Sequence, residues 1–76
     1  MTEQDVRAAL CKVLNSEKPK LWAVDYRFLG DAIDSLDHAA FVLSLQEDYG
    51  VTVSDDVLEE LDTVANVVAF ANRAGG

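Results

Sequence analysis

A serine at the start of a predicted helix is the residue of this sequence best placed for covalent chemistry. Ser35 directly follows Asp34, and the sole histidine, His38, lies three residues further along. Catalysis by a serine needs a base that a third group orients, and no such third partner is identifiable for His38. A helix N-terminus does favour a phosphate, because its free amides and its dipole are positive there. We therefore expect a phosphate ester at Ser35, with helix capping as the alternative role of this serine.

The negative charge of the chain is concentrated in its second part. The 76 residues carry a net charge of −8, and residues 28–72 contain ten acids without any lysine or arginine. A field of one sign repels nucleic acids and anionic membranes and attracts partners with basic surfaces. The length allows a single domain, residues 1–76, and is too short for a large enclosed active site. The acids at positions 55, 56, 59 and 60 lack the ligand spacing of an EF-hand, so we expect no metal site there.

Hydrophobic spacing and end signals predict four helices. The first covers residues 2–15, the second residues 35–49, and a brief third follows an extended run at residues 51–53. The end signals are the capping-box pair Thr2 and Asp5, the ends Asn15 and Gly50, and the caps Ser54 and either Asp62 or Thr63. The predicted fold class is all-α, a four-helix bundle with a long loop between helices 1 and 2 and a short third helix.

The long connection between the first two helices, residues 16–34, is rich in apolar side chains. Connections of this length in a small domain are usually functional or disordered, and this one is too apolar to be disordered. We expect it to fold down over the bundle, anchored by Phe28 and Leu29. Trp22 and Tyr26 are then expected to cover the core.

The second helix has apolar residues on two nearly opposite faces. The face suited to the core holds Phe41, Val42, Leu45 and Tyr49. The opposite face holds Leu36, Ala39, Ala40, Leu43 and the stem of Glu47. A domain of this size cannot bury both faces of one helix. We therefore expect the second set to stay exposed beside acidic residues, as a docking site for other proteins.

The run Asp34-Ser35-Leu36-Asp37 resembles that of an acyl carrier protein, and the resemblance extends through Tyr49-Gly50 and residues 51–56 over essentially the whole chain. It implies a carrier without catalytic activity of its own. It also implies that a phosphopantetheinyl transferase attaches 4′-phosphopantetheine to Ser35, next to Asp34. The thiol of this arm would hold acyl groups as thioesters and present them to biosynthetic enzymes.

The resemblance further implies roles for both faces of the second helix. Acyl-transferring, condensing and tailoring enzymes with basic patches would dock at Leu36, Asp37, Ala40, Leu43, Glu47, Asp48, Asp55 and Asp56. An acyl chain sheltered inside the bundle would meet His38, Phe41, Val42, Leu45, Phe28 and Leu61.

Three positions depart from the usual pattern of that family. Ala32 stands where a glycine often precedes the modified serine, and His38 stands where a small hydroxyl residue is frequent. Ala40 replaces a glutamate that is common in fatty-acid carriers and meets partner arginines. We therefore expect a specialised carrier of a fatty-acid, lipid or polyketide pathway. Asp34 favours an acyl carrier over the alternative, a peptidyl or aminoacyl carrier.

Two other classes of protein stay open. A helical interaction module without a prosthetic group would use Ser35 only as a cap. The terminal pair Gly75-Gly76 is similar to that of ubiquitin-like modifiers, but their fold needs several alternating strands and only residues 51–53 have an extended pattern. With one cysteine, Cys11, and no apolar leader or long apolar span, the chain is expected to be a cytoplasmic monomer without membrane insertion.

Overall fold

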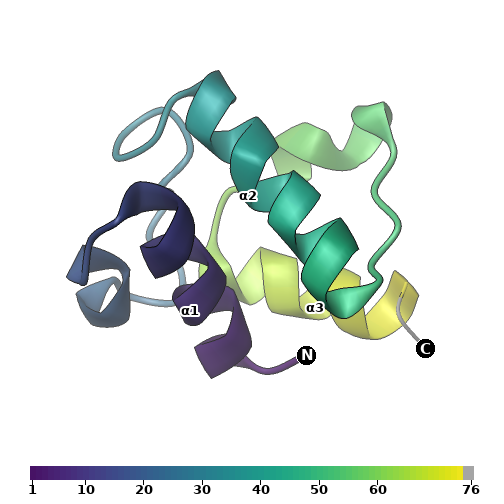
Figure 1. Ribbon diagram of the computed structural model, residues 1–76, viewed down its shortest axis with the longest axis horizontal. Coiled ribbons are helices and arrows are strands. Elements are labelled where there is room, and N and C mark those ends of the chain that lie inside the picture. The colour runs from purple at the N-terminus through teal and green to yellow at the C-terminus, as the bar shows by residue number, and fades with distance from the viewer. Residues whose placement is uncertain (75–76) are drawn as a thin grey trace.

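A computed structural model describes residues 1–74, which form five helical segments joined by loops (Figure 1). They are the α-helices α1 (Glu3–Leu14), α2 (Ser35–Tyr49) and α3 (Val64–Ala74) and the 3₁₀ helices η1 (Lys18–Leu21) and η2 (Asp55–Glu60). No β-strand forms in that part of the chain, so the all-α prediction is confirmed. The pair Gly75-Gly76 lies outside the described residues. The predicted third helix corresponds to η2, whereas η1 lies in the segment that we expected to be a loop.

The predicted end signals of the three α-helices are confirmed. At the start of α1, Thr2 Oγ1 accepts a hydrogen bond from the Asp5 amide (3.2 Å), and Asp5 Oδ2 accepts one from the Thr2 amide (2.8 Å). Gly50 ends α2 in the left-handed conformation, with φ of 68°. At the start of α3, Thr63 Oγ1 accepts a hydrogen bond from the Asn66 amide (3.0 Å).

The predicted capping role of Ser54 is wrong. Ser54 stands at the N-cap position of η2, but its hydroxyl donates to Asp56 Oδ1 (2.6 Å) and caps no amide. The six residues of η2 form a 3₁₀ helix, and none of them is buried. Only Val57 and Leu58 are half-buried, so η2 covers this side of the core with few side chains.

The core combines apolar side chains from the three α-helices with several from the connection between α1 and α2. Phe28 from that connection and Phe41 from α2 are fully buried, and their rings meet edge to face with centroids 6.1 Å apart. Trp22 stacks on Phe28 at 5.6 Å. The predicted anchor at Phe28 is therefore confirmed, and Leu29 and Tyr26 also pack against the core.

The inner face of α2 is buried as predicted except at its end. Phe41, Val42 and Leu45 are each at most 5% exposed, whereas Tyr49 is 42% exposed and its expected core position is wrong. The chain turns away from the helix axis after Tyr49, and Val51, which is 4% exposed, fills the core there instead.

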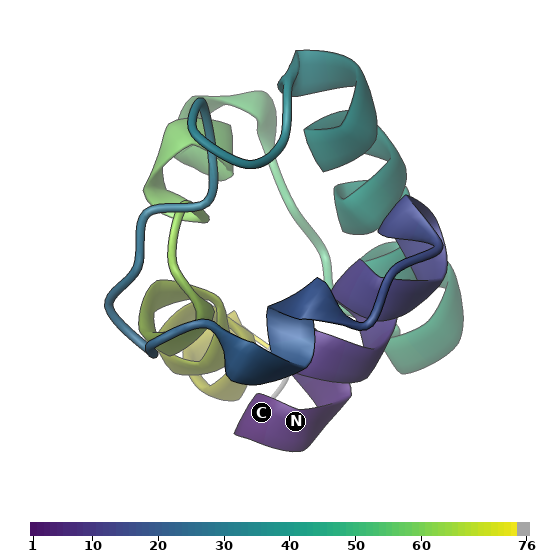
Figure 2. The same cartoon turned by 90° about the vertical axis from the view of Figure 1, so that its left-hand side faces the viewer.

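The connection between α1 and α2 is tied down along its length. Arg7 of α1 donates from Nη1 to the carbonyl oxygens of Pro19 (2.8 Å) and Trp22 (2.7 Å). Further along, the Ala65 amide at the start of α3 donates to the Val24 carbonyl (3.0 Å). Figure 2 shows this connection running from η1 along one side of the molecule up to the start of α2. The long connection therefore has a defined path that ends at Ser35.

Replacement of Arg7 tests the first of these ties. Arg7→Met keeps an aliphatic stem and removes the donors to Pro19 and Trp22. Because a hydrogen bond from a charged donor contributes about 1.5–3 kcal/mol, we expect the free energy of unfolding in urea to fall by about 2 kcal/mol. Amide hydrogen exchange should become faster at η1.

The matched control is Lys12→Met, on the same helix. Lys12 is exposed and forms an ion pair with Asp48, so its loss should cost less than about 1 kcal/mol. Equal losses of stability in the two variants would contradict the special role of Arg7.

Candidate functional site

Ser35 is the first residue of α2, and its side chain is exposed. The N-cap is Asp34, whose Oδ1 accepts a hydrogen bond from the Asp37 amide (2.9 Å) and whose carbonyl accepts one from the His38 amide (2.9 Å). The alternative role of Ser35 as the cap is therefore wrong, because Asp34 occupies that position. Among the hydrogen bonds of residues 1–74, none involves the Ser35 hydroxyl, so this oxygen is free for chemistry from outside the protein.

The first turn of α2 has the features that a phosphate needs. The amides of Asp37 and His38 donate hydrogen bonds to Asp34. The amides of Ser35 and Leu36 have no acceptor within the helix, because no helical carbonyl precedes them by four residues. Such amides, together with the positive end of the helix dipole, stabilise an anion. The residues present thus fit a phosphodiester on Ser35.

The backbone before α2 turns sharply. The Phe28 carbonyl accepts hydrogen bonds from the amides of Ala32 (2.8 Å) and Ile33 (3.0 Å), and Gly30 adopts φ of 91°, which favours glycine. The Gly30 amide in turn donates to the Ile33 carbonyl (2.9 Å). The positive φ of this turn is thus at Gly30, which explains how an alanine can stand at position 32.

An open cleft of about 570 Å³ lies beside Ser35. It is bounded by the turn before α2, the first turns of α2, and η2, and is lined by Arg27, Leu29, Gly30, Ile33, Asp34, Ser35, His38, Ala39, Leu58 and Glu59. Sequence reasoning missed Ile33, Ala39 and Leu58 as cleft residues. The periodicity of α2 could have indicated Ala39, but the other two depend on how the connection and η2 fold toward it.

Of the predicted acyl-pocket residues, only His38 lines this cleft. It is 5% exposed, and its Nε2 lies 2.9 Å from the Leu61 carbonyl oxygen. Because a carbonyl only accepts, this nitrogen carries the hydrogen and donates it. The other five predicted residues are buried in the core: Phe28, Phe41, Val42, Leu45 and Leu61. His38 therefore lies at the boundary between cleft and core, with its ring 6.2 Å from that of Phe41.

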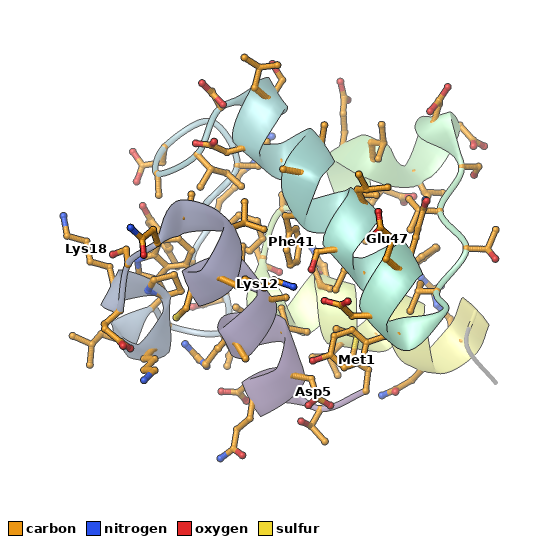
Figure 3. All side chains as sticks on the ribbon, in the orientation of Figure 1. Met1, Asp5, Lys12, Lys18, Phe41 and Glu47 are labelled. Carbon is orange, nitrogen blue, oxygen red and sulfur yellow. The ribbon has the colours of Figure 1, made fainter. Side chains whose placement is uncertain are left out.

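The outer face of α2 carries the predicted docking residues on its surface. Leu36 is 80% exposed and Leu43 is 53% exposed, and Ala39, Ala40 and Glu47 are exposed with them. In Figure 3, the labelled Glu47 projects outward from α2, whereas Phe41 points toward the interior. This exposed face begins next to Ser35. Asp37 is half-buried, and Asp55 and Asp56 are exposed on η2.

Asp48 differs from the other predicted docking acids because it has a basic partner. Its Oδ2 lies 3.2 Å from Lys12 Nζ of α1 and accepts a hydrogen bond from Ser44 Oγ (3.1 Å). Figure 3 shows Lys12 reaching from α1 toward α2. The ammonium group and the hydroxyl lower the pKa of Asp48 below its usual value. This pairing between distant segments has no signal in the sequence, and it reduces the charge that Asp48 offers to a partner.

Two findings bear on other kinds of site. Within residues 1–74, no three histidine, cysteine or acidic side chains come together as metal ligands. The same part of the chain contains no helix long and apolar enough to cross a membrane.

Comparison with known proteins identifies the family. The family described as "Phosphopantetheine attachment site" matches residues 4–71. The chain is 35% identical to the acyl carrier protein of Akkermansia muciniphila, over 97% of this chain and 92% of that protein. It is 30% identical to the acyl carrier proteins of Rickettsia canadensis and Rickettsia massiliae, over 90% of this chain and 79% of theirs.

The chain therefore belongs to the acyl carrier protein family. The prosthetic group of this domain is 4′-phosphopantetheine.

Two substitutions separate the cap of α2 from its first residue. Asp34→Ala removes the side chain that accepts from the Asp37 amide, and we expect unfolding free energy to fall by about 1 kcal/mol. Ser35→Ala removes a hydroxyl that makes no intramolecular bond, and stability should change by less than about 0.5 kcal/mol. Urea unfolding followed by circular dichroism measures both. A larger loss for Ser35→Ala than for Asp34→Ala would reverse the assignment of the cap.

Proposed function

We propose that this protein is an acyl carrier, without catalytic activity of its own, whose Ser35 is the attachment point of 4′-phosphopantetheine. The observation that carries the proposal is the exposed Ser35 hydroxyl at the start of α2, without an intramolecular hydrogen bond and beside two unbonded amides. When bound, the arm supplies a thiol that holds an acyl group as a thioester.

The residues around Ser35 support attachment by a separate enzyme. A base within the protein would have to accept the hydrogen of the Ser35 hydroxyl, but among residues 1–74 this hydroxyl forms no hydrogen bond with Asp34 or His38. A phosphopantetheinyl transferase therefore has to supply the base. The Ser35 oxygen then bonds to the phosphorus that bears the pantetheine in coenzyme A, the diphosphate bond breaks, and adenosine bisphosphate leaves. The amides of Ser35 and Leu36 stabilise the phosphodiester charge.

The outer face of α2 is the proposed docking surface for partner enzymes. Its exposed apolar residues, Leu36 and Leu43, stand beside Asp37 and Glu47, which favours acyl-transferring, condensing and tailoring enzymes with basic patches. Asp55 and Asp56 of η2 extend the negative field, and Asp48 contributes less because Lys12 partly neutralises it. In this proposal the carrier acts as a monomer in the cytoplasm.

The lack of a carboxylate at Ala40 favours a specialised pathway of fatty-acid, lipid or polyketide synthesis. Ala40 is exposed in the middle of the proposed docking surface, where a glutamate would add a negative charge. Partner enzymes that rely on such a charge would bind this carrier less strongly, so a dedicated set of enzymes fits better.

Loading of the protein with coenzyme A and a promiscuous phosphopantetheinyl transferase tests the proposal. Intact-protein mass spectrometry should show a gain of one phosphopantetheinyl group, and peptide mapping should place it on Ser35. The gain should disappear in Ser35→Ala.

Ser44→Ala is the matched control for the loading experiment, because it removes another serine of the same helix. It should be loaded like the wild type. Absence of any mass gain with an active transferase, or a gain that persists in Ser35→Ala, would contradict the proposed attachment site.

Charge reversal tests the docking surface. In Asp37→Lys and Glu47→Lys, acyl transfer by a partner enzyme should slow by roughly tenfold at low salt, because steering by opposite charges is lost. The effect should shrink as salt is added. Steady-state kinetics at several salt concentrations measure it, with the helical spectrum as a check on folding.

Asp25→Lys is the control, since it changes the net charge by the same amount at an exposed position outside α2. It should affect transfer much less. Equal slowing by Asp25→Lys and Glu47→Lys would show that net charge matters and that α2 is not the docking surface.

A further inference from the structure

The cleft beside Ser35 is lined by both apolar and charged side chains. Leu29, Ile33, Ala39 and Leu58 contribute apolar side chains to it, and the half-buried Leu58 comes from the loosely covering η2. Charged side chains, Arg27 and Glu59, also line it. A small apolar group at the end of an arm that is attached to Ser35 and folds back can therefore leave water within this cleft.

His38 stands where the cleft meets the core. Its side chain lines the cleft, yet it is 5% exposed and its Nε2 donates to the Leu61 carbonyl. Directly beyond it are Phe41 and Leu61, both fully buried. A group that extends from the cleft into the core past His38 must therefore move the imidazole.

Moving the imidazole is unfavourable for two reasons. The hydrogen bond between Nε2 and the Leu61 carbonyl breaks, and both groups then need new partners in surroundings that are almost without water. Among residues 1–74, no buried side-chain nitrogen or oxygen lacks a hydrogen-bond partner, so the site as it stands is fully satisfied. The core behind His38 is close-packed around Phe28 and Phe41, whose rings are in edge contact.

We propose that His38 closes the inner end of the cleft and restricts the cargo sheltered there to short acyl groups, so that longer saturated chains stay outside the protein. This inference rests on the proposed attachment of the arm at Ser35. It makes His38 a residue that determines cargo specificity through its size and its hydrogen bond. The imidazole takes no part in bond making or breaking.

The test loads the protein with arms that carry acetyl, butyryl, octanoyl or dodecanoyl groups and measures how fast hydroxylamine cleaves each thioester. In the wild type, butyryl should be protected relative to the free acyl-pantetheine, whereas octanoyl and dodecanoyl should gain no further protection. In His38→Ala the longer chains should become protected by roughly tenfold, because the imidazole and its hydrogen bond to the Leu61 carbonyl no longer close the cleft.

Two further variants serve as controls. His38→Gln keeps an amide donor near the Leu61 carbonyl and should retain the restriction. Phe41→Leu makes room behind His38 but leaves the imidazole in place, and should also retain it. Each cleavage rate is compared with that of the butyryl form of the same variant, so that a general loss of stability cancels.

A measurement on the wild type alone covers the case in which the His38 variants fail to fold. His38 is the only histidine, so its imidazole signals in the NMR spectrum are assigned without ambiguity. Replacing butyryl by octanoyl should leave these signals unchanged. Shifted imidazole signals would overturn the inference. Protection that rises steadily with chain length in the wild type would also overturn it, as would equal protection of the longer chains in His38→Ala and the wild type. Failure to load any arm would overturn the proposed function and with it this inference.

Discussion

The structure depends on the way that Phe28 fixes the connection between α1 and α2. Its side chain is fully buried between Trp22 and Phe41, its amide donates to the Asp62 carbonyl (3.0 Å), and its own carbonyl accepts from the amides of Ala32 and Ile33. Both the side chain and the backbone of Phe28 thus fix the position of the connection at this residue. Because the chain leaves this point through a hydrogen-bonded turn, the start of α2 and its Ser35 have a fixed position beside the cleft.

The small size of the domain explains why one helix serves both the core and the surface. A domain with three α-helices can bury only one side of α2. Phe41 and Leu45 lie on that buried side, and Leu36 and Leu43 remain exposed on the other side. The short η2 completes the enclosure with half-buried side chains only, and the cleft lies between it and the first turns of α2. The small size of the domain thus leaves an exposed face on α2 and an open cleft next to it.

The sequence predicted the features that arise from local signals. The helix ends and the two faces of α2 follow from periodicity and capping residues, which act over a few positions. The errors are at places where the path of the chain decides. Tyr49 is exposed where the chain turns at Gly50 and Val51 is buried, and the long connection, which contains η1, is held by distant Arg7 through its carbonyls. The pairing of Lys12 with Asp48 is of the same kind.

The cleft illustrates this limit at the site itself. The position of Ser35 at a helix start could be predicted, but the wall opposite it comes from segments whose approach no local pattern specifies. Of the six residues expected to line an acyl pocket, five form the closed core, and only His38 faces the opening. The hydrophobic pattern of the sequence alone does not distinguish a residue that lines a pocket from one that fills the core.

The most direct measurement is the mass of the protein purified from its own cells, together with the mass of its Ser35 peptide. We expect a phosphopantetheinyl group on that peptide and an acyl thioester on a fraction of the molecules. A protein that carries no such group, although other carriers in the same cells are modified, would contradict it.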